Sequence, residues 1–304
     1  MKPVKTTYFG IQRKIVANMT GESWYSVPHA GPVVEFDVTD LLATFDQLRA
    51  SGKLQYKLSI NTLMLKIIAE GLKSAQNLNA HITYDRRYVK GRVDLFDEIH
   101  FSVPMALPNG EMMTLTFRNF ENKSLDEMSA YIADLHRRMG NSNLAEAMYE
   151  VSMDNTLNAL RHCKLGTVLG RLIGAKCGKN KLKTLKGKAK RAYYAIPECD
   201  RVTKRDIEQG TITVSNLGAL DRGRVGHCGF LEIIPPQVAV IALYAVTERP
   251  WVVTNADGVK DVAIRKILPV TVLFDHRACD YSDTLPLLDK IQDVCDHPEQ
   301  ILNW

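Results

Sequence analysis

A histidine between two carboxylates stands near the C-terminus, within residues 274–280 (FDHRACD). His276 directly follows Asp275, and Asp280 comes four positions later. Near neutral pH an imidazole can take up and return a proton, so this segment can supply a general base. Asp280 is placed either to hold the turn or to cap a following helix. Histidine and aspartate at this spacing are common in proteins, so the segment alone does not define an activity.

A second group that can do chemistry is Ser215, which ends the apolar run 211–215 and directly precedes Asn216. A hydroxyl at the end of a strand can donate a hydrogen bond to an oxyanion that forms beside it. It can equally bond to the backbone of its own turn, which would make it structural. Residues 235–237 (PPQ) precede the next apolar run and favour an extended entry into a strand.

Six cysteines stand at positions 163, 177, 199, 228, 279 and 295 without a C-x-x-C pair. This pattern favours reduced thiols over a disulfide framework or a zinc site. Cys279 lies close enough to His276 in sequence to suggest a Cys–His nucleophile, but a small buried residue is the interpretation we favour. We expect no metal site, and we expect the other seven histidines to be structural or solvent-facing.

Buried strands are expected to carry both candidate groups. Residues 211–215, 238–246 and 267–274 are rich in β-branched and apolar side chains, which favours strands inside a sheet. A helix over residues 282–296 follows, with apolar side chains on one face. His276 therefore lies at a tight corner between the last buried strand and the last helix, where its ring can be rigid and still reachable.

The first half of the chain alternates strand and helix periodicity, starting with a half-buried strand over residues 33–38. Local signals mark the ends of its elements: Asp40 and Asn61 as helix caps, Ser124 with Glu127 as a capping box, and Asn109-Gly110 as the turn of a tight hairpin between 98–106 and 111–117.

The composition is that of a folded globular protein: 304 residues, 45% hydrophobic and 24% charged. It excludes disordered, collagen-like and disulfide-stapled chains, and no apolar run reaches the roughly 18–20 residues of a membrane span. The N-terminus is too polar for a secretory signal, so we expect a cytoplasmic protein. With no linker in view, we expect one α/β domain over residues 1–304 with a basic insertion at about 140–205.

The positive charge is concentrated in one stretch. Residues 161–205 hold 14 Lys or Arg and 2 Asp or Glu, while the rest of the chain is mildly acidic. An apolar stripe at helical spacing begins the stretch, although Gly166, Gly170 and Gly174 weaken the helix prediction. An exposed insertion or lid is the plainest interpretation, attraction to a phosphate-bearing substrate or an acidic lipid surface is the alternative, and nucleic-acid binding is disfavoured.

Taken in order, these segments resemble the catalytic domain of the dihydrolipoamide acyltransferases of 2-oxoacid dehydrogenase complexes, which shares its fold with chloramphenicol acetyltransferase. The motifs D-H-R-x-x-D-G, T-x-S-N-x-G and N-P-P-Q of that family are similar to residues 275–280, 213–218 and 234–237. Shorter matches are Arg13-Lys14-Ile15 with Met19, Val27-Pro28-His29 and Leu78-Asn79-Ala80. The resemblance spans about residues 10–139 and 203–302. It implies a two-layer α/β sandwich of a mixed β-sheet with helices, interrupted by the basic insertion.

The resemblance implies that His276 is the general base for an acceptor that attacks a thioester carbonyl. Ser215 would donate a hydrogen bond to the tetrahedral oxyanion, and losing such a donor costs about 3 kcal/mol, or a hundredfold in rate. Asp280 would orient the corner through an ion pair, with Arg13 as its candidate partner. In the family the acyl group passes directly between substrates in a trimer, whose sites combine the histidine of one subunit with the serine of the next.

Two features differ from the family pattern. Tyr281 replaces the glycine that ends the family motif, and the sequence begins at the catalytic domain, so we expect no lipoyl arm in cis. Our main hypothesis is therefore a stand-alone acyltransferase that takes a coenzyme A thioester as substrate, binds no permanent cofactor, and acylates an unknown small-molecule or carrier acceptor.

The alternatives are an acyltransferase core subunit whose lipoyl domain is on another chain, and a non-catalytic scaffold that keeps the fold. For partners we expect a homotrimer, weak contact with an anionic membrane surface at most, and no nucleic acid.

Overall fold

The computed structural model describes the chain except for residues 107–111, 162, 164, 180, 222 and 256. Its strands are β1 (His29–Ala30), β2 (Val33–Asp37), β3 (Ala80–Asp85), β4 (Lys90–Leu95), β5 (Phe101–Ala106), β6 (Met112–Phe117), β7 (Ile212–Asn216), β8 (Ala239–Leu243), β9 (Thr247–Thr254) and β10 (Lys260–Asp275). Its α-helices are α1 (Ile11–Ser26), α2 (Thr39–Ala50), α3 (Ile60–Leu72), α4 (Leu125–Gly140), α5 (Leu144–Arg161), α6 (Leu165–Lys176), α7 (Gly187–Tyr194) and α8 (Leu285–Asp296).

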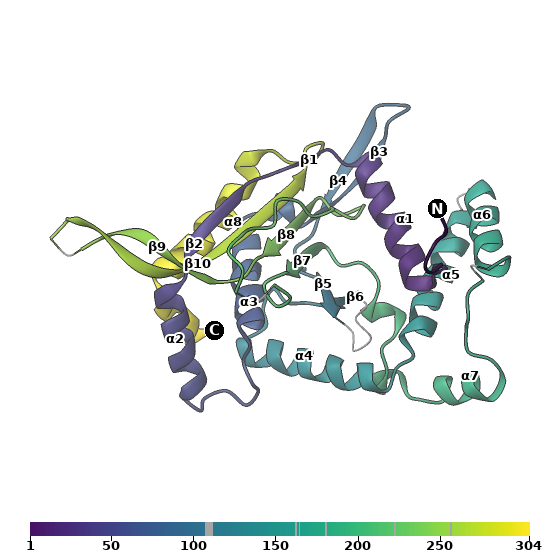
Figure 1. Cartoon of the computed structure of the whole chain (residues 1–304), viewed down its shortest axis with the longest axis horizontal. Helices are drawn as coiled ribbons and strands as arrows, with labels where there is room; N and C mark the ends of the chain where they lie inside the picture. The colour runs from purple at the N-terminus through teal and green to yellow at the C-terminus, as the bar shows by residue number, and fades with distance from the viewer. Residues whose placement is uncertain (107–111, 162, 164, 180, 222, 256) are drawn as a thin grey trace.

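One mixed sheet organises the chain (Figure 1). Its strands are ordered β1-β10-β8-β7-β5-β6, and β2 and β9 also pair with β10. β7 runs parallel to both β5 and β8, whereas β10 is antiparallel to all its partners. The remaining pair, β3 with β4, forms a separate hairpin. The central position of β7, β8 and β10 agrees with the prediction from their apolar sequences.

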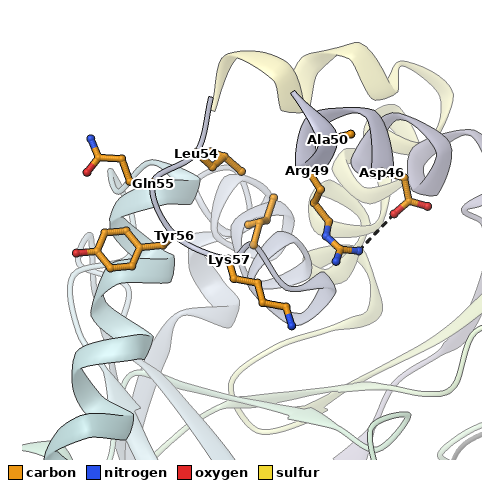
Figure 2. Close-up of a pocket in the computed structure, with 8 residues that line it drawn as sticks. Asp46, Arg49, Ala50, Leu54, Gln55, Tyr56 and Lys57 are labelled. Atoms are coloured by element: carbon orange, nitrogen blue, oxygen red, sulfur yellow. Dashed lines mark hydrogen bonds and ion pairs between the residues drawn. The ribbon is translucent and has the colours of Figure 1, made fainter. Parts of the chain in front are cut away.

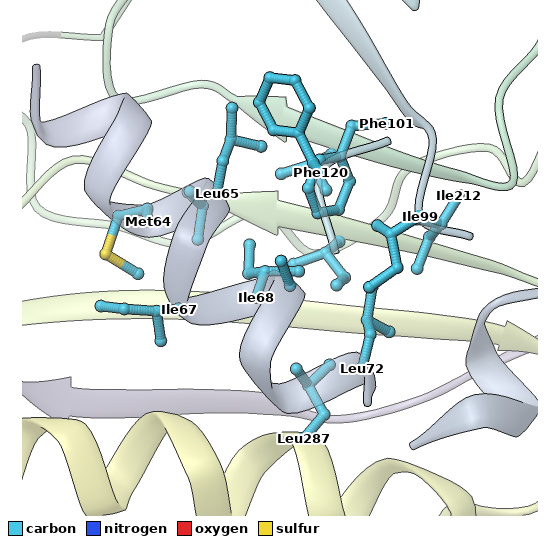
Figure 3. Packing of buried hydrophobic residues seen from close by; sticks show 14 of the residues in the cluster. Met64, Leu65, Ile67, Ile68, Leu72, Ile99, Phe101, Phe120, Ile212 and Leu287 are labelled. Carbon is cyan, nitrogen blue, oxygen red and sulfur yellow. The ribbon is translucent and has the colours of Figure 1, made fainter. Parts of the chain in front are cut away.

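The main hydrophobic core lies between one face of this sheet and helices α2, α3 and α8. Figure 3 shows side chains of α3 packing against strand residues Phe101 and Ile212 and against Leu287 of α8. A Cβ at Gly71 of α3 would lie 2.6 Å from Leu287 Cδ1, so the glycine lets the two helices pack closely. The two-layer α/β prediction is confirmed.

Of the three helix starts predicted from local signals in the first half of the chain, one is right. Ser124 and Glu127 form the expected capping box at the start of α4. The Asn61 prediction is wrong, because α3 starts one residue earlier and the Ser59 side chain accepts from the Thr62 backbone N–H instead.

The cap prediction for Asp40 is also wrong. α2 begins at Thr39, so Asp40 lies inside its first turn, and its carboxylate pairs with Arg265 at 2.7 Å. β5 and β6 pair antiparallel as predicted, while the connection predicted as a tight Asn109-Gly110 turn lies outside the described residues.

The basic stretch forms α6 and α7 and follows α5 (Figure 1). α6 is helical although it contains three glycines, and it buries no side chain. The lysines from Lys176 to Lys190 are exposed, whereas α7 buries Tyr193 after them, and the Arg201 guanidinium lies 5.2 Å from the centre of that ring. None of the described helices combines the length and apolarity that crossing a membrane requires.

Candidate active site

His276 is the first residue after β10, at the predicted corner between the last core strand and the C-terminal helices. Its backbone N–H donates to the Pro28 carbonyl at 2.9 Å, and the preceding Asp275 pairs with His29 of β1. After the corner the chain enters a short 3-10 helix, η4 (Tyr281–Thr284), and then α8. The backbone at His276 is therefore anchored on both sides, which is what a precisely placed catalytic group requires.

A buried ion pair closes the corner. Asp275 is fully buried, and its two oxygens lie 2.9 Å from Nε and 2.5 Å from an Nη of Arg277. The Arg277 backbone N–H also donates to this carboxylate at 3.0 Å, and the backbone N–H groups of Ala278 and Cys279 donate to the Asp275 carbonyl. Hydrogen bonds to Asp275 raise the pKa of Arg277 above its usual value. Sequence analysis assigned no role to this pair, although both residues belong to the quoted motif.

The imidazole of His276 is oriented through one of its nitrogens. Nδ1 lies 3.2 Å from the Cys279 carbonyl oxygen and 3.4 Å from a carboxylate oxygen of Asp280. Both neighbours are hydrogen-bond acceptors, so the neutral ring carries its proton on Nδ1 and leaves the lone pair on Nε2. The side chain is 54% exposed. A reachable, unprotonated Nε2 is the arrangement that a general base needs.

Asp280 has two structural contacts. Its carboxylate is 78% exposed and faces His276 Nδ1, and it forms a reciprocal capping box with Asp283 at the start of η4. The capping expectation is thus met. The expected ion pair with Arg13 is absent from the described part of the chain, and the salt bridge that fixes the corner is the Asp275–Arg277 pair.

Cys279 is buried directly behind the histidine. Its thiol donates to the Asn77 carbonyl at 3.2 Å, and burial raises its pKa to about 12. A thiol in this environment stays protonated and does not act as a nucleophile at neutral pH. Tyr281, which replaces the family glycine, is exposed and begins η4, so the larger residue is accommodated without entering the core.

Ser215 lies in β7 and is only 4% exposed. It pairs with Ala242 of β8, and Ala242 pairs with Thr271 of β10, five residues before His276. At about 3.3 Å per residue and about 4.8 Å between strands, Ser215 and His276 are on the order of 19 Å apart within one chain. A single chain therefore does not bring the two predicted catalytic groups together.

Gln237 holds the Ser215 strand to its surroundings through a buried hydrogen-bond network. Its side chain is fully buried, accepts from the Thr213 hydroxyl at 2.6 Å and donates to the Gly210 carbonyl at 2.8 Å. The Pro235–Pro236 peptide bond before it is cis. Sequence analysis found in this segment only an extended strand entry. A glutamine directly before an apolar strand is the one sequence signal of a buried amide here, because a buried amide must find partners, but the partners themselves are not visible in the sequence.

His29 supports the corner from the opposite strand. Its Nε2 accepts from the Ile233 backbone N–H at 3.0 Å, and its ring packs 4.8 Å from the ring of Phe230. Burial lowers the pKa of His29, so the ring is neutral in the folded protein at pH 7. Its role in this chain is structural, as expected for the histidines other than His276.

A surface pocket of about 490 Å³ lies elsewhere, at the end of α2 (Figure 2). It is lined by Asp46, Arg49, Ala50, Leu54, Gln55, Tyr56, Lys57 and Leu58. Neither His276 nor Ser215 belongs to it. In the described residues no three His, Cys, Asp or Glu side chains converge as a metal site would require.

Comparison with known sequences places these observations in a family context. The sequence model of the family described as 2-oxoacid dehydrogenases acyltransferase (catalytic domain) matches residues 3–152 and 180–303. The dihydrolipoyllysine-residue acetyltransferase component of the mitochondrial pyruvate dehydrogenase complex of Neurospora crassa is 24% identical over 291 residues, which is 95% of this chain and 48% of that protein. The chain thus spans about half the length of the curated relatives it matches.

Solved structures give the same fold. The dihydrolipoamide acetyltransferase of Azotobacter vinelandii superposes with a TM-score of 0.65 at 18% identity and covers 99% of this chain and 94% of its own. The cubic core of the pyruvate dehydrogenase multienzyme complex superposes with a TM-score of 0.62 at 18% identity, covering 99% of this chain and 94% of its own. At this identity the likeness shows the fold and leaves the chemistry to be argued from the site.

Proposed function

The chain belongs to the family of 2-oxoacid dehydrogenase acyltransferase catalytic domains, and from this premise we propose that it transfers an acyl group from a thioester to an acceptor. The observation that carries the proposal is the His276 corner. There, two acceptors lie beside Nδ1, a buried ion pair fixes the backbone, and the side chain is 54% exposed. This is the geometry of a general base for a thiol, hydroxyl or amine.

The reaction follows from these groups. His276 Nε2 takes the proton of the acceptor as its heteroatom attacks the thioester carbonyl carbon. The Ser215 hydroxyl donates to the tetrahedral oxyanion. When the carbon–sulfur bond breaks, the leaving thiolate takes the proton back from the imidazolium, so the acyl group moves directly and the enzyme is unchanged. Cys279 takes no part, because its buried thiol stays protonated.

Such a site requires two chains. Ser215 and His276 are on the order of 19 Å apart within one chain, so the serine would come from a neighbouring copy. The hairpin of β9 and β10 supports this assembly, because Val252, Val262 and Ile264 are exposed on it. Exposed apolar side chains in such number on one ribbon are typical of a surface that another subunit covers. We propose a homotrimer as the smallest active species.

The acceptor and donor are best argued from the relatives. The two relatives named above are dihydrolipoyl or dihydrolipoamide acetyltransferases, which favours transfer between a dihydrolipoyl thiol and coenzyme A over an unknown acceptor. We therefore propose that the chain acts in a core assembly with the lipoyl group on a partner chain, with the coenzyme A thioester as substrate and no permanently bound cofactor. A stand-alone trimer with another acceptor is the rival, and particle mass in solution separates the two.

The first test measures thiol release from acetyl-CoA and longer acyl-CoAs in the presence of dihydrolipoamide, hydroxyl and amine acceptors. We expect His276→Ala to lose about 10²- to 10⁴-fold in turnover and Ser215→Ala to lose about 10²-fold. His136→Ala is the matched control, because His136 is exposed on α4, far along the chain from the corner. Equal turnover in wild type and His276→Ala would end the general-base assignment, and no turnover in the wild type with any acceptor would support the scaffold alternative.

The second test addresses the two-chain site. When His276→Ala and Ser215→Ala chains are unfolded, mixed in equal amounts and refolded, about a quarter of the subunit interfaces combine an intact His276 with an intact Ser215. Activity of the mixture should therefore rise to about that fraction of wild type, while each variant alone stays inactive. A mixture as inactive as its parents would show that the two groups do not meet across subunits.

A further inference from the structure

An apolar stripe on α6 is open to solvent. Leu165 and Leu169 are 64% and 61% exposed, and Leu172 and Ile173 are exposed beside them. These four positions are spaced by three, four and seven residues, so they share one side of the helix. Val168 and Ala175, which are half-buried, lie on another side. The helix thus turns its most apolar side away from the protein.

Exposed cations flank this stripe in the sequence. Between positions 161 and 191 the described Lys and Arg side chains are all exposed: Arg161, Arg171, Lys176, Lys179, Lys181, Lys183, Lys186, Lys188, Lys190 and Arg191. No Asp or Glu occurs between positions 161 and 197. Of these ten, only Lys190 makes a salt bridge within the described residues, to Glu146 at 3.4 Å. The charge is therefore available for an anionic surface.

The segment stands apart from the catalytic fold. Figure 1 shows α6 at the edge of the molecule, next to the N-terminus and away from the sheet. It is nevertheless held in place, because the Lys14 ammonium donates to the Gly174 carbonyl and Lys179 lies 5.5 Å from the centre of the Tyr8 ring. The matching family model also leaves out residues 153–179, which include all of α6. The helix thus contacts the N-terminal segment and lies outside the part of the chain that matches the family model.

We propose that α6 and the lysines after it dock the protein on an anionic phospholipid surface. The leucine stripe inserts at the boundary between headgroups and acyl chains, while Lys181, Lys183, Lys186 and Lys188 bind lipid phosphates. Insertion removes the exposed apolar side chains from water, and the phosphates supply the negative charge that the segment lacks.

Other occupants fit the surface less well. A nucleic acid would pair with the lysines but would leave the leucine stripe in water, and no aromatic side chain of α6 offers a base to stack on. A second copy of the same segment would bring two dense clusters of cations together. A protein partner would have to cover a surface rich in lysine, which protein interfaces generally avoid. A lipid surface satisfies both the apolar and the charged part.

The experiment is co-sedimentation of the full chain with vesicles of phosphatidylcholine alone or with roughly 30% phosphatidylglycerol, at about 50 and about 500 mM salt. The wild type should bind the anionic vesicles at low salt, at least about tenfold more weakly at high salt, and the neutral vesicles not at all. Leu169→Ser with Ile173→Ser should weaken vesicle binding at least about tenfold and leave retention on heparin, a polyanion without an apolar interior, unchanged. A variant with Gln in place of Lys181, Lys183, Lys186 and Lys188 should weaken both vesicle binding and heparin retention.

Two matched variants on the β3–β4 hairpin serve as controls: Val93→Ser with Leu95→Ser for the apolar change, and Gln at 86, 87, 90 and 92 for the charge change, all at exposed positions. Both should bind vesicles like the wild type. Equal binding of the wild type to neutral vesicles would overturn the proposal. So would full vesicle binding by the serine variant, which would indicate a general polyanion surface, or self-association that the serine variant abolishes, which would indicate a second copy.

Discussion

Cysteine side chains experience opposite surroundings in two regions of the molecule. Cys228, Cys279 and Cys295 are buried, Cys295 in α8 and the other two in loops that pack on the core, and burial raises the pKa of Cys279 and of Cys295 to about 12. Cys163, Cys177 and Cys199 are exposed, and all three lie in the basic stretch 161–205. The cysteines are therefore shielded from water in one region and accessible to solvent in the other.

The two regions are also stabilised differently. At the His276 corner, a buried carboxylate, a guanidinium and several backbone N–H groups fix the position of one ring. In the basic stretch, exposed side chains surround a helix that buries none of its own. The comparison teaches that the first region is built to place one group accurately, whereas the second presents a chemical surface whose exact geometry matters less.

The thiols give the largest expected contrast. A pKa of about 12 in place of 9.0 lowers the thiolate fraction about a thousandfold, and burial slows reagent access further. With a disulfide reagent near pH 8 we expect three fast thiols, which Cys177→Ser reduces to two, and three that react only in denaturant. Modification of Cys279 as fast as Cys177 would show that the corner opens in solution and would remove the contrast between the regions.

The corner ion pair gives the next largest effect. Arg277→Gln leaves the buried Asp275 carboxylate without its cation, which costs about 3 kcal/mol in free energy of unfolding. The lower end of the usual range applies because the Arg277 side chain is 25% exposed. Urea unfolding measures the loss. The control is Arg49→Gln, which removes a 3.5 Å salt bridge to Asp46 in which both side chains are exposed. This variant should lose less than about 0.5 kcal/mol in free energy of unfolding. Similar losses in both variants would mean that the corner is no more rigid than the surface.

Sequence analysis succeeded where the cause of a feature is local. The buried strands, the Ser124 capping box and the corner at His276 depend on residues within a few positions of each other, so pattern and spacing were enough. It failed at Asn61, because the nearby Ser59 caps α3 instead, and it missed contacts whose partner is distant in the sequence. Asp40 was expected to cap a helix, but it pairs with Arg265, 225 positions later. A distant partner leaves no mark in the local pattern.

The candidate site shows the same limit. His276 was found because its motif is contiguous, and its orienting acceptors follow within four residues. The Gln237 side chain joins its own segment to Gly210 and Thr213 and to Ser102 of β5, and these partners are known only from the structure. Combining Ser215 with His276 requires a second chain, so neither one sequence nor one protomer contains the complete site. The functional roles of both residues stay predictions that the mixing experiment tests.

A smaller effect is expected from pH at the edge of the corner. His29 accepts a hydrogen bond from Ile233 through an unprotonated nitrogen, and its folded-state pKa lies below the ordinary 6.5. The unfolded chain therefore binds this proton more readily, so the stability is complete above about pH 6.5 and is lost as the pH falls below it. The lost hydrogen bond is worth about 1 kcal/mol.

Urea midpoints at pH 7.5 and 5.5 measure this loss, and His29→Gln should show a shallower pH dependence than the wild type. His81, whose pKa burial also lowers, contributes equally to both proteins and is the internal reference. An unchanged slope in His29→Gln would mean that the ring does not clamp β1 to the loop that contains Ile233.

The smallest global effect is expected in α6. In the variant Gly166→Ala with Gly170→Ala, the added methyl groups meet no atom within 4 Å. Each alanine favours the helical state by about 1 kcal/mol relative to glycine. If α6 opens independently of the sheet, its amides should exchange more slowly in the variant, while the free energy of unfolding of the whole protein, measured in urea, changes by less than about 0.5 kcal/mol. The same change at Gly71 in α3 should destabilise the protein, because the new Cβ meets Leu287 at 2.6 Å. A global gain of the full amount from the α6 alanines would instead show that this helix unfolds together with the core, and the two regions would then differ in charge but not in stability.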